Sequence, residues 1–340
     1  MGRVVLVTGV SRDLGGRLAR LVAADPSVDR VIGVDVVPPR GDMGDVRFIR
    51  ADIRNPVITK VIAGEDVDTV VHMSVVAGPS GAGGRTSMKE TNVIGTMQLL
   101  AACQKAPGLE HLVVKSTTAV YGSSSRDPAM FTEDMEPKRL PKSGFAKDSV
   151  EVEGYVRGFA RRRPDVRVTT LRTATVVGPT VSTPLVQYFK LPVIPTVLGF
   201  DPRLQFLHET DLLEVLRHAT VDGPAGTFNV AGDGVLMLSQ AIRRLGRPSL
   251  PMPTFAAISV GSLIRRARVA DLSAEQMAFL TFGRGVDTTR MRTMLGFAPD
   301  YSSAAAFEDF GRSIGPGLVS ADRVAHVESV VAGALGGNDG

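Results

Sequence analysis

The sequence contains one cysteine, four tyrosines and no apolar run long enough to cross a membrane. Because Cys103 has no second cysteine to pair with, an internal disulfide is excluded, and the five histidines show no metal-ligand spacing. The longest apolar stretch late in the chain, 254–264, is far shorter than a bilayer span. Lys and Arg form no long stripe interleaved with aromatic residues, which argues against a nucleic-acid partner. We therefore expect no metal, no nucleic acid and no integral membrane span.

The bulk composition is that of an ordinary globular protein. Hydrophobic residues make up 44% of the 340 positions and charged residues 22%, with a formal net charge of +4. This length allows one large domain or two coupled ones. Residues 1–3 lead directly into an apolar pattern without a signal peptide, and the single cysteine fits a reducing compartment, so we expect a cytoplasmic protein.

The first half of the chain alternates short β-branched runs with longer segments of helical spacing. Near-continuous apolar runs are typical of strands that are buried on both faces. Strand–helix alternation produces a parallel sheet with right-handed crossovers, so we predict a doubly wound α/β fold. The expected strands are 4–8, 31–35, 47–49, 69–73, 112–116 and 166–171, and the expected helices are 15–24, 87–103 and 146–162.

The second half is less regular. After Pro179 the chain contains many prolines and one further strand pattern, 226–230, which suggests a smaller lobe over the carboxyl edge of the sheet. Ligands of open α/β sheets bind at that edge, where a lobe would contact substrate and exclude water. We expect a first domain at 1–179, a mixed substrate lobe at 180–322 with segments that return to the core, and a tail at 323–340.

Residues 4–16 predict a buried strand that turns through glycines into a helix. Gly9 permits a tight turn after the strand, and Gly15 lets the helix approach the sheet closely. Backbone N–H groups at the start of a helix, together with the helix dipole, bind a pyrophosphate. The intervening residues Arg12, Asp13 and Leu14 belong to the same predicted dinucleotide site.

Asp35 ends the next expected strand, about 20 residues after Gly15, which is the spacing at which an acid reaches the ribose hydroxyls of a dinucleotide. A carboxylate there would repel a 2′-phosphate, so we predict NAD rather than NADP. Arg12 leaves NADP open, since a guanidinium can pair with a phosphate; we interpret it as a pyrophosphate or surface contact. The alternative is an ordinary strand–helix turn with a surface aspartate.

Over most of its length the chain resembles the extended short-chain dehydrogenase/reductases, and among them the NAD-dependent nucleotide-sugar epimerase/dehydratase family (UDP-glucose 4-epimerase-like). The loop at 8–15 is similar to the family's Thr-Gly-x-x-Gly-x-x-Gly, with Arg12 in place of the middle glycine. The resemblance implies a Rossmann-like fold, NAD, a nucleotide-sugar substrate and a homodimer formed through the helices at 87–103 and 146–162. Further matching segments are 52–53, 71–74, 92–96, 116–122, 171–179, 206–211 and 287–299.

The resemblance also implies several cofactor contacts. A pair of residues after the third expected strand corresponds to the family's adenine contact. Two residues at the end of the fourth-strand motif and the asparagine of the Asn-x-x-Gly-Thr helix start are also implied to contact the cofactor. A lysine corresponds to the residue that anchors the nicotinamide ribose. These residues are Asp52, Ile53, Met73, Ser74, Asn92 and Lys147.

The catalytic segment departs from the family pattern. In this family a tyrosine four residues before the lysine exchanges a proton with the sugar hydroxyl, while NAD takes a hydride from the adjoining carbon. That position is Ser143, four residues before Lys147. A phenol beside a cation can exchange a proton near neutrality, whereas an aliphatic hydroxyl is a far weaker acid. Thr117 occupies the position of the family's catalytic hydroxyl.

The sequence offers one replacement for the missing phenol. Tyr155 follows Lys147 by eight residues, about 12 Å along a helix, and is too far away. Tyr121 lies in the loop after the fifth strand and is the only plausible stand-in, although we favour its interpretation as a packed or substrate-lining residue. For Thr117 the alternative is a local backbone hydrogen bond, and for Lys147 a solvated helix residue. We interpret His208 as packed and helix-capping rather than catalytic.

Three hypotheses follow. The first is a nucleotide-sugar epimerase/dehydratase, for example a UDP-hexose 4-epimerase that uses transient hydride transfer. The second is a catalytically impaired NAD-binding protein of the same fold with a structural or regulatory role. The third is an atypical NAD(P)H reductase that takes its proton from Thr117, Tyr121 or the substrate. We favour the first.

Overall fold

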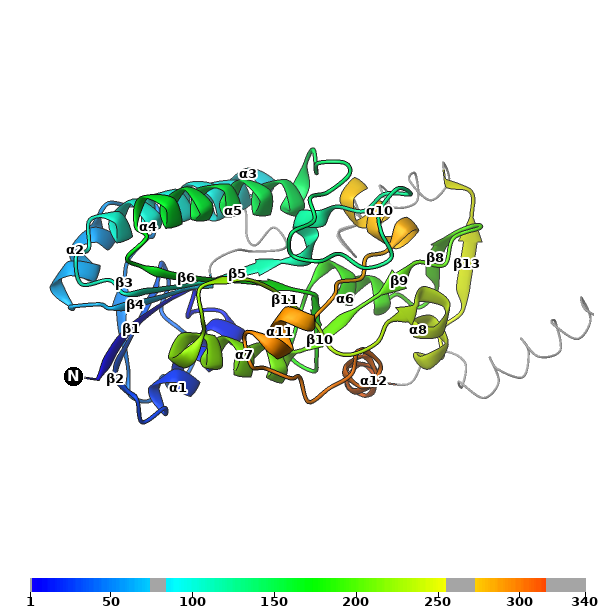
Figure 1. Ribbon diagram of the computed structural model, residues 1–340. Helices are drawn as coiled ribbons and strands as arrows, with labels where there is room; N and C mark the ends of the chain where they lie inside the picture. Colours follow the sequence, from blue (N-terminus) through cyan, green and yellow to red (C-terminus); the bar gives the residue numbers. More distant parts are fainter. Residues whose placement is uncertain (1, 74–83, 255–272, 316–340) are drawn as a thin grey trace, which may run out of the picture.

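A parallel sheet of seven strands forms the centre of the molecule, in the order β11-β6-β5-β4-β1-β2-β3 (Figure 1). The computed structural model describes residues 2–73, 84–254 and 273–315. The central strands are rich in β-branched residues and are mostly buried on both faces, as expected for a parallel sheet. Their bounds are β1 Arg3–Thr8, β2 Val28–Asp35, β3 Val46–Arg50, β4 Thr69–His72, β5 His111–Thr117, β6 Arg167–Thr173 and β11 Gly226–Val230.

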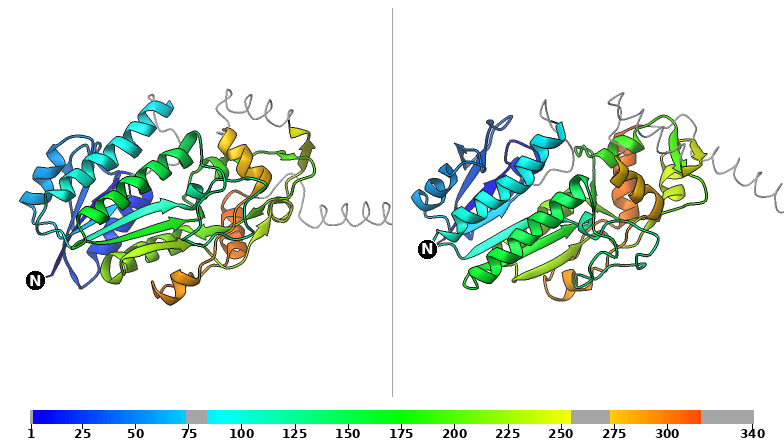
Figure 2. Two further views of the ribbon diagram at one scale, coloured as in Figure 1. Left: turned by 45° about the horizontal axis from the view of Figure 1, so that its top comes forward. Right: turned by 90° about the horizontal axis from the view of Figure 1, so that it is seen from above.

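Helices cover both faces of this sheet. On one face lie α1 (Asp13–Ala23) and α7 (Glu209–Asp222), and on the other α2 (Val57–Gly64), α4 (Gly95–Gln104) and α5 (Gly144–Arg162) (Figures 1 and 2). Because successive strand residues point to opposite faces, Val7 belongs to the core under α1 and Leu6 to the core under α4. The doubly wound α/β fold predicted from the sequence is confirmed.

The expected strands of the first half are all present, as are the helices expected over 15–24 and 146–162. The helix expected over 87–103 is not continuous: α3 (Gly84–Lys89) leads into a π-helical turn, η1 (Glu90–Ile94), before α4 begins. Such turns interrupt the regular helical hydrogen bonds at functional sites in many proteins. Here the turn carries Asn92, one of the residues expected to contact the cofactor.

The placement of 226–230 in the smaller lobe is wrong. This segment is β11, an edge strand of the main sheet, where Gly226 pairs with Thr169 and Val230 with Thr173 of β6. The chain reaches this edge through α7, which packs beside α1 and completes a further strand–helix–strand crossover. A seventh strand extends the sheet because its apolar residues, Phe228 and Val230, are buried against that helix layer.

A smaller lobe lies beyond the carboxyl ends of the main strands (Figure 2). Its core is aromatic, with Phe189, Phe206 and Phe307 in mutual contact. Two-stranded sheets join β7 to β10, β9 to β12 and β8 to β13. The elements are β7 Thr175–Val177, α6 Pro184–Phe189, β8 Ile194–Val197, β9 Arg203–Leu204, β10 Phe206–His208, β12 Leu236–Met237, α8 Leu238–Arg244, β13 Ser249–Met252, α10 Ala274–Phe282, α11 Thr289–Thr293 and α12 Ser303–Ser313.

Within the described residues, no helix has the length and apolar character that crossing a bilayer requires. The same residues contain no group of three His, Cys, Asp or Glu side chains placed to hold a metal ion.

Candidate active site at the carboxyl edge of the sheet

The turn after β1 brings a helix N-terminus to the edge of the sheet. Gly9 has a φ of 80°, which glycine adopts without steric cost. A Cβ at Gly15 would lie 2.1 Å from the Gly9 carbonyl oxygen, so only a glycine lets α1 start this close to the turn. Arg12 is the N-cap residue of α1, in an extended conformation and without a side-chain cap. The first N–H groups of α1 therefore remain available to an anion at this edge.

Asp35 lies beside this turn at the end of β2. Its Oδ2 accepts a hydrogen bond from the Ser11 backbone N–H at 3.0 Å, and its Oδ1 accepts one from Val36 N–H at 2.7 Å. The two hydrogen bonds hold the carboxylate next to the loop. The structure thus brings together the glycine turn and the acid, which the sequence separates.

Asp13 and Leu14, the other expected loop residues, have structural contacts. Asp13 Oδ2 accepts a hydrogen bond from Thr180 Oγ1 at 2.9 Å, and Leu14 packs against the core under α1. The same threonine hydroxyl lies 2.9 Å from Glu209 Oε2. The start of α1 is therefore tied to the start of α7.

The expected adenine-side residues lie on the neighbouring strand ends. Ile53 and Met73 are buried. Asp52 pairs with Arg54, whose Nη2 lies 2.6 Å from Oδ2, and this hydrogen bond and the opposite charge lower the pKa of Asp52. Asn92 is fully buried, with its Nδ2 3.5 Å from Asp148 Oδ2. Ser74 lies outside the described residues.

Three expected catalytic positions lie at the carboxyl end of β5 and at the start of α5. Thr117 ends β5, and its Oγ1 accepts a hydrogen bond from Ala119 N–H at 3.2 Å, which caps the short 3₁₀ helix η2 (Thr118–Tyr121). Ser143 is exposed at the N-cap of α5 and makes no side-chain cap. One turn later, Lys147 Nζ lies 3.7 Å from Glu151 Oε1.

Tyr121 lies in the interior instead of at the edge. Its side chain is 1% exposed and stacks on Phe131 with ring centroids 4.5 Å apart. The hydroxyl donates to Asn229 Oδ1 at 2.8 Å and accepts from Arg172 Nη1 at 2.8 Å. Burial raises the pKa of Tyr121, against the effect of Arg172. The structure therefore favours the packed interpretation of Tyr121 over the role of stand-in for the missing phenol.

A family model described as the NAD dependent epimerase/dehydratase family matches residues 5–231. The chain belongs to this family. NAD, the cofactor expected from Asp35 and the glycine turn, is the cofactor of the family, and the residues of the turn fit its pyrophosphate and ribose.

Two relatives differ widely in their sequence identity to this chain. An uncharacterized protein of Mycobacterium tuberculosis is 50% identical over 317 residues, covering 92% of this chain and 84% of its own. A probable UDP-arabinose 4-epimerase of Oryza sativa is 27% identical over 188 residues, covering 51% of this chain and 45% of its own.

Solved structures show the same fold. The UDP-glucuronic acid 4-epimerase of Bacillus cereus in complex with NAD superposes with a TM-score of 0.67 at 18% identity, covering 92% of this chain and 98% of its own. The UDP-glucose 4-epimerase of Thermotoga maritima with UDP-glucose gives 0.68 at 16% identity, covering 91% and 98%. The Rossmann-like fold expected from the resemblance is confirmed.

In this member of the epimerase/dehydratase family, a helix of the smaller lobe contacts the segment 143–147, where Ser143 replaces the family's tyrosine. Both carboxylate oxygens of Glu275, on α10, lie 3.1 Å from the Ala146 N–H in the first turn of α5. A Cβ at Gly144, whose φ is +74°, would lie 2.1 Å from Glu275 Oε2. A carboxylate therefore covers the helix N-terminus that begins after Ser143. Sequence reasoning missed Glu275 because 129 residues separate it from its partner.

A buried ion pair behind the site was also missed. Arg172 Nη2 lies 2.7 Å from Glu153 Oε2, and the two side chains are 11% and 5% exposed. Ser116 Oγ donates to Glu153 Oε1 at 2.6 Å, so the pair connects α5, β6 and the residue before Thr117. Arg172, a second arginine in an apolar and threonine-rich strand that already begins with Arg167, was the available signal.

His208 has the structural role expected of it. It is the N-cap of α7, where its Nδ1 accepts a hydrogen bond from Thr210 N–H at 3.3 Å. Its ring stacks on Tyr301 with centroids 3.9 Å apart, and Nε2 lies 3.1 Å from Asp309 Oδ2.

Proposed function

We propose that this protein is an NAD-dependent nucleotide-sugar epimerase/dehydratase, for example one that interconverts UDP-hexoses at C4. The observation that supports this proposal best is the placement of the glycine turn, Asp35 and Thr117 at the carboxyl ends of strands in one sheet, with Lys147 in the first turn of α5. Relatives and structural neighbours named as UDP-sugar 4-epimerases provide further support.

The chain's own residues have distinct roles in this proposal. Gly9, Gly15 and the start of α1 bind the pyrophosphate, and Asp35 binds the adenosine ribose. Lys147 contacts the nicotinamide ribose, and Thr117 contacts the sugar hydroxyl. Bound NAD supplies the hydride acceptor for the adjoining carbon. The smaller lobe holds the nucleotide sugar and excludes water from the edge.

A second candidate, an NAD-binding protein with little or no catalytic activity, is favoured by one specific observation. Ser143 replaces the phenol, and the tyrosine nearest in the chain to Thr117, Tyr121, has its hydroxyl bonded to Asn229 and Arg172. Both candidates predict cofactor binding, and they differ in turnover.

Turnover of nucleotide sugars by the purified protein tests the proposal. We expect bound NAD or NADH after purification and measurable interconversion of UDP-glucose and UDP-galactose, or of a related pair, without net consumption of cofactor. Cofactor binding without turnover across a broad panel of nucleotide sugars would establish the second candidate. Stoichiometric oxidation of NADH or NADPH by a carbonyl substrate would instead identify a reductase.

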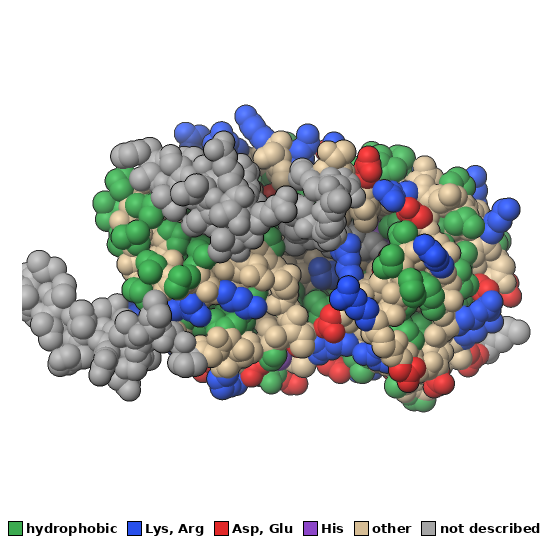
Figure 3. All heavy atoms as spheres, turned by 180° about the vertical axis from the view of Figure 1, so that it is seen from behind, with side chains coloured by type: hydrophobic (Ala, Val, Ile, Leu, Met, Phe, Trp, Pro, Cys, Tyr) green, Lys and Arg blue, Asp and Glu red, His purple; other side chains and the backbone are tan. Residues whose placement is uncertain are grey.

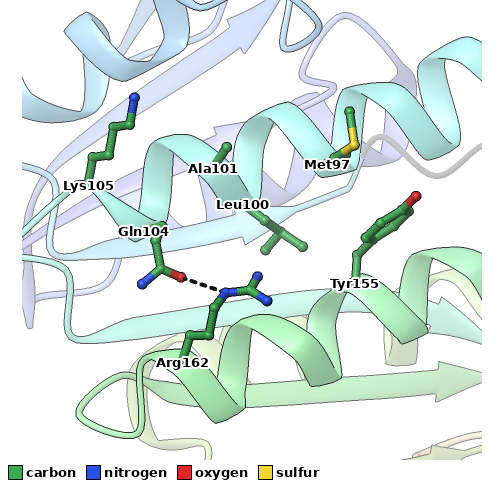
Figure 4. A pocket seen from close by; sticks show the side chains of 7 residues that line it. All are labelled: Met97, Leu100, Ala101, Gln104, Lys105, Tyr155 and Arg162. Carbon is green, nitrogen blue, oxygen red and sulfur yellow. Dashed lines mark hydrogen bonds between the residues drawn. The ribbon is translucent and has the colours of Figure 1, made fainter.

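We also propose a homodimer formed through α4 and α5. These helices leave an open groove between them, lined by apolar and basic side chains (Figure 4). Tyr155 is 40% exposed beside it, while Leu100 is buried at its base. The lining residues are Met97, Leu100, Ala101, Gln104, Lys105, Tyr155 and Arg162. We place the protein in the cytoplasm, consistent with its single, buried cysteine.

Substitution of Tyr155 tests the dimer. A charge introduced into a buried apolar interface is strongly unfavourable, so Tyr155→Glu is expected to shift the protein from dimer to monomer in light scattering after size-exclusion chromatography. Leu250→Glu is the matched control, since Leu250 is 54% exposed on β13, outside the proposed interface. A monomeric wild-type protein, or equal dissociation in both variants, would refute this interface.

A further inference from the structure

Lys115 interrupts the buried strand β5 at the level of the glycine turn. Val114 of β5 pairs with His72 of β4, and His72 pairs with Thr8 of β1. Lys115 follows Val114 by one residue and is therefore level with the residue after Thr8, where the glycine turn begins. Alternate strand residues share a face, which places Lys115 on the same face as Val113, packed in the core under α1.

The charge of Arg12, the N-cap residue of α1 after the glycine turn, acts on this lysine. β5 and β1 are separated by two strand spacings, about 10 Å, a gap that two long basic side chains reaching toward each other can span. Lys115 keeps some contact with solvent although protein surrounds it. Burial, and then the positive charge of Arg12, lower the pKa of Lys115 to about 8.

The two cations are not neutralised by the protein around them. Neither side chain forms an ion pair with an Asp or Glu of the described residues, although Asp35 acts on Arg12 from a longer distance. Two like charges in a partly enclosed space repel each other and lose hydration, which destabilises the chain unless an anion is bound between them. Basic side chains also gather around a hollow in the middle of the face shown in Figure 3.

We propose that Lys115 and Arg12 together bind the diphosphate of the dinucleotide cofactor, from the β5 side and from the loop side of the turn. This inference rests on the proposed function. The helix N-terminus supplies backbone N–H groups to the same anion, and the two side chains add charge-assisted hydrogen bonds. Lys115 is thus a binding residue two positions before Thr117 on the same strand. A nucleotide-sugar substrate also carries a diphosphate, so the experiment compares the two sources.

Calorimetric titration of the full chain with ADP-ribose, UDP and adenosine tests this assignment. For Lys115→Met we expect affinity for ADP-ribose to fall about 10- to 100-fold, the effect of losing one charged hydrogen bond. Adenosine, which has no phosphate, and UDP are expected to bind as to wild type. Lys60→Met is the matched control because Lys60 is exposed on α2. The melting temperature of ligand-free Lys115→Met should equal or exceed that of wild type, since an unpaired ammonium is removed.

The pH dependence gives an independent readout. Arg12 is the charged group that acts on Lys115 among the described residues, and it does not titrate in the accessible range. A bound diphosphate raises the pKa of Lys115, so affinity for ADP-ribose is full below about pH 8 and is lost as pH rises through the raised value. Lys115→Arg keeps the charge, and its affinity should not change between pH 7 and about pH 10.

The possible outcomes separate this inference from the proposed function. Wild-type protein that binds neither NAD nor ADP-ribose would overturn both. Equal ADP-ribose affinity in wild type and Lys115→Met, or an equal loss for adenosine and ADP-ribose, would overturn the inference alone. A loss confined to UDP would assign the two cations to the substrate instead and would also overturn it.

Discussion

Replacing Ser143 with tyrosine is expected to raise the rate of nucleotide-sugar turnover by at least about 10²-fold, the usual contribution of a positioned acid–base group. Ser143 is exposed, and its extended backbone (φ −157°, ψ 176°) accepts any side chain. A phenol at this position projects from the start of α5 one turn before Lys147. The lysine ammonium would lower the pKa of the phenol from its usual value near 10.

The control for this variant is Ser143→Phe, which adds the same ring without the hydroxyl. The measured quantity is kcat for the most active nucleotide-sugar pair, with the bound NAD content of each variant matched. If Ser143→Tyr turns over no faster than Ser143→Phe, the loss of activity extends beyond this one residue. That result would favour the NAD-binding protein without catalysis.

Glu275 modifies this expectation. Its carboxylate lies against the first turn of α5, where a negative charge raises the pKa of a nearby phenol and partly cancels the effect of Lys147. The double variant Ser143→Tyr, Glu275→Gln is therefore expected to reach its maximal rate at a lower pH than Ser143→Tyr alone. A pH–rate profile of the two variants checks this shift.

Replacing Glu153 with methionine is expected to reduce the free energy of unfolding by about 3–5 kcal/mol, the typical effect of removing one partner of a buried ion pair. Arg172 would keep its charge in the interior, bonded only to the neutral Tyr121 hydroxyl and the Glu133 carbonyl. Burial acts to lower the pKa of Arg172, but the hydrogen bonds and charge of Glu153 raise it above the ordinary value.

Urea unfolding of Glu153→Met, Arg172→Met and the double variant measures this effect. The double variant should be considerably more stable than Glu153→Met, because no uncompensated charge remains. Additive losses in the double variant would show that the charges do not interact. Ser116 also loses its acceptor in Glu153→Met, so the segment that carries Thr117 should exchange its amide hydrogens faster.

Local sequence signals predicted the cofactor half of the site. Gly9 and Gly15 were recognisable because a strand that turns tightly into a helix needs glycines at positions close together in the sequence. The strand runs were recognisable because a parallel sheet buries both faces of its strands. Lys115 could have been noticed as the single charge in the apolar run before Thr117, a signal that was present and not used.

Contacts between distant parts of the chain were not predictable in the same way. The edge position of 226–230 depends on the path of α7 across the sheet, and no residue within the strand encodes it. The burial of Tyr121 depends on Asn229, Arg172 and Phe131, which come from three separate segments.

The sequence by itself determined the family, the parallel sheet, the glycine turn with Asp35, and the absence of a phenol at Ser143, because each is a property of neighbouring residues or of regular spacing. The tertiary structure alone decided that Tyr121 is bonded in the interior, that Glu275 covers the start of α5, and that the charge of Arg12 acts on the buried Lys115. These depend on which side chains the packed sheet and lobe bring together, and burial then sets their charge and hydrogen bonding.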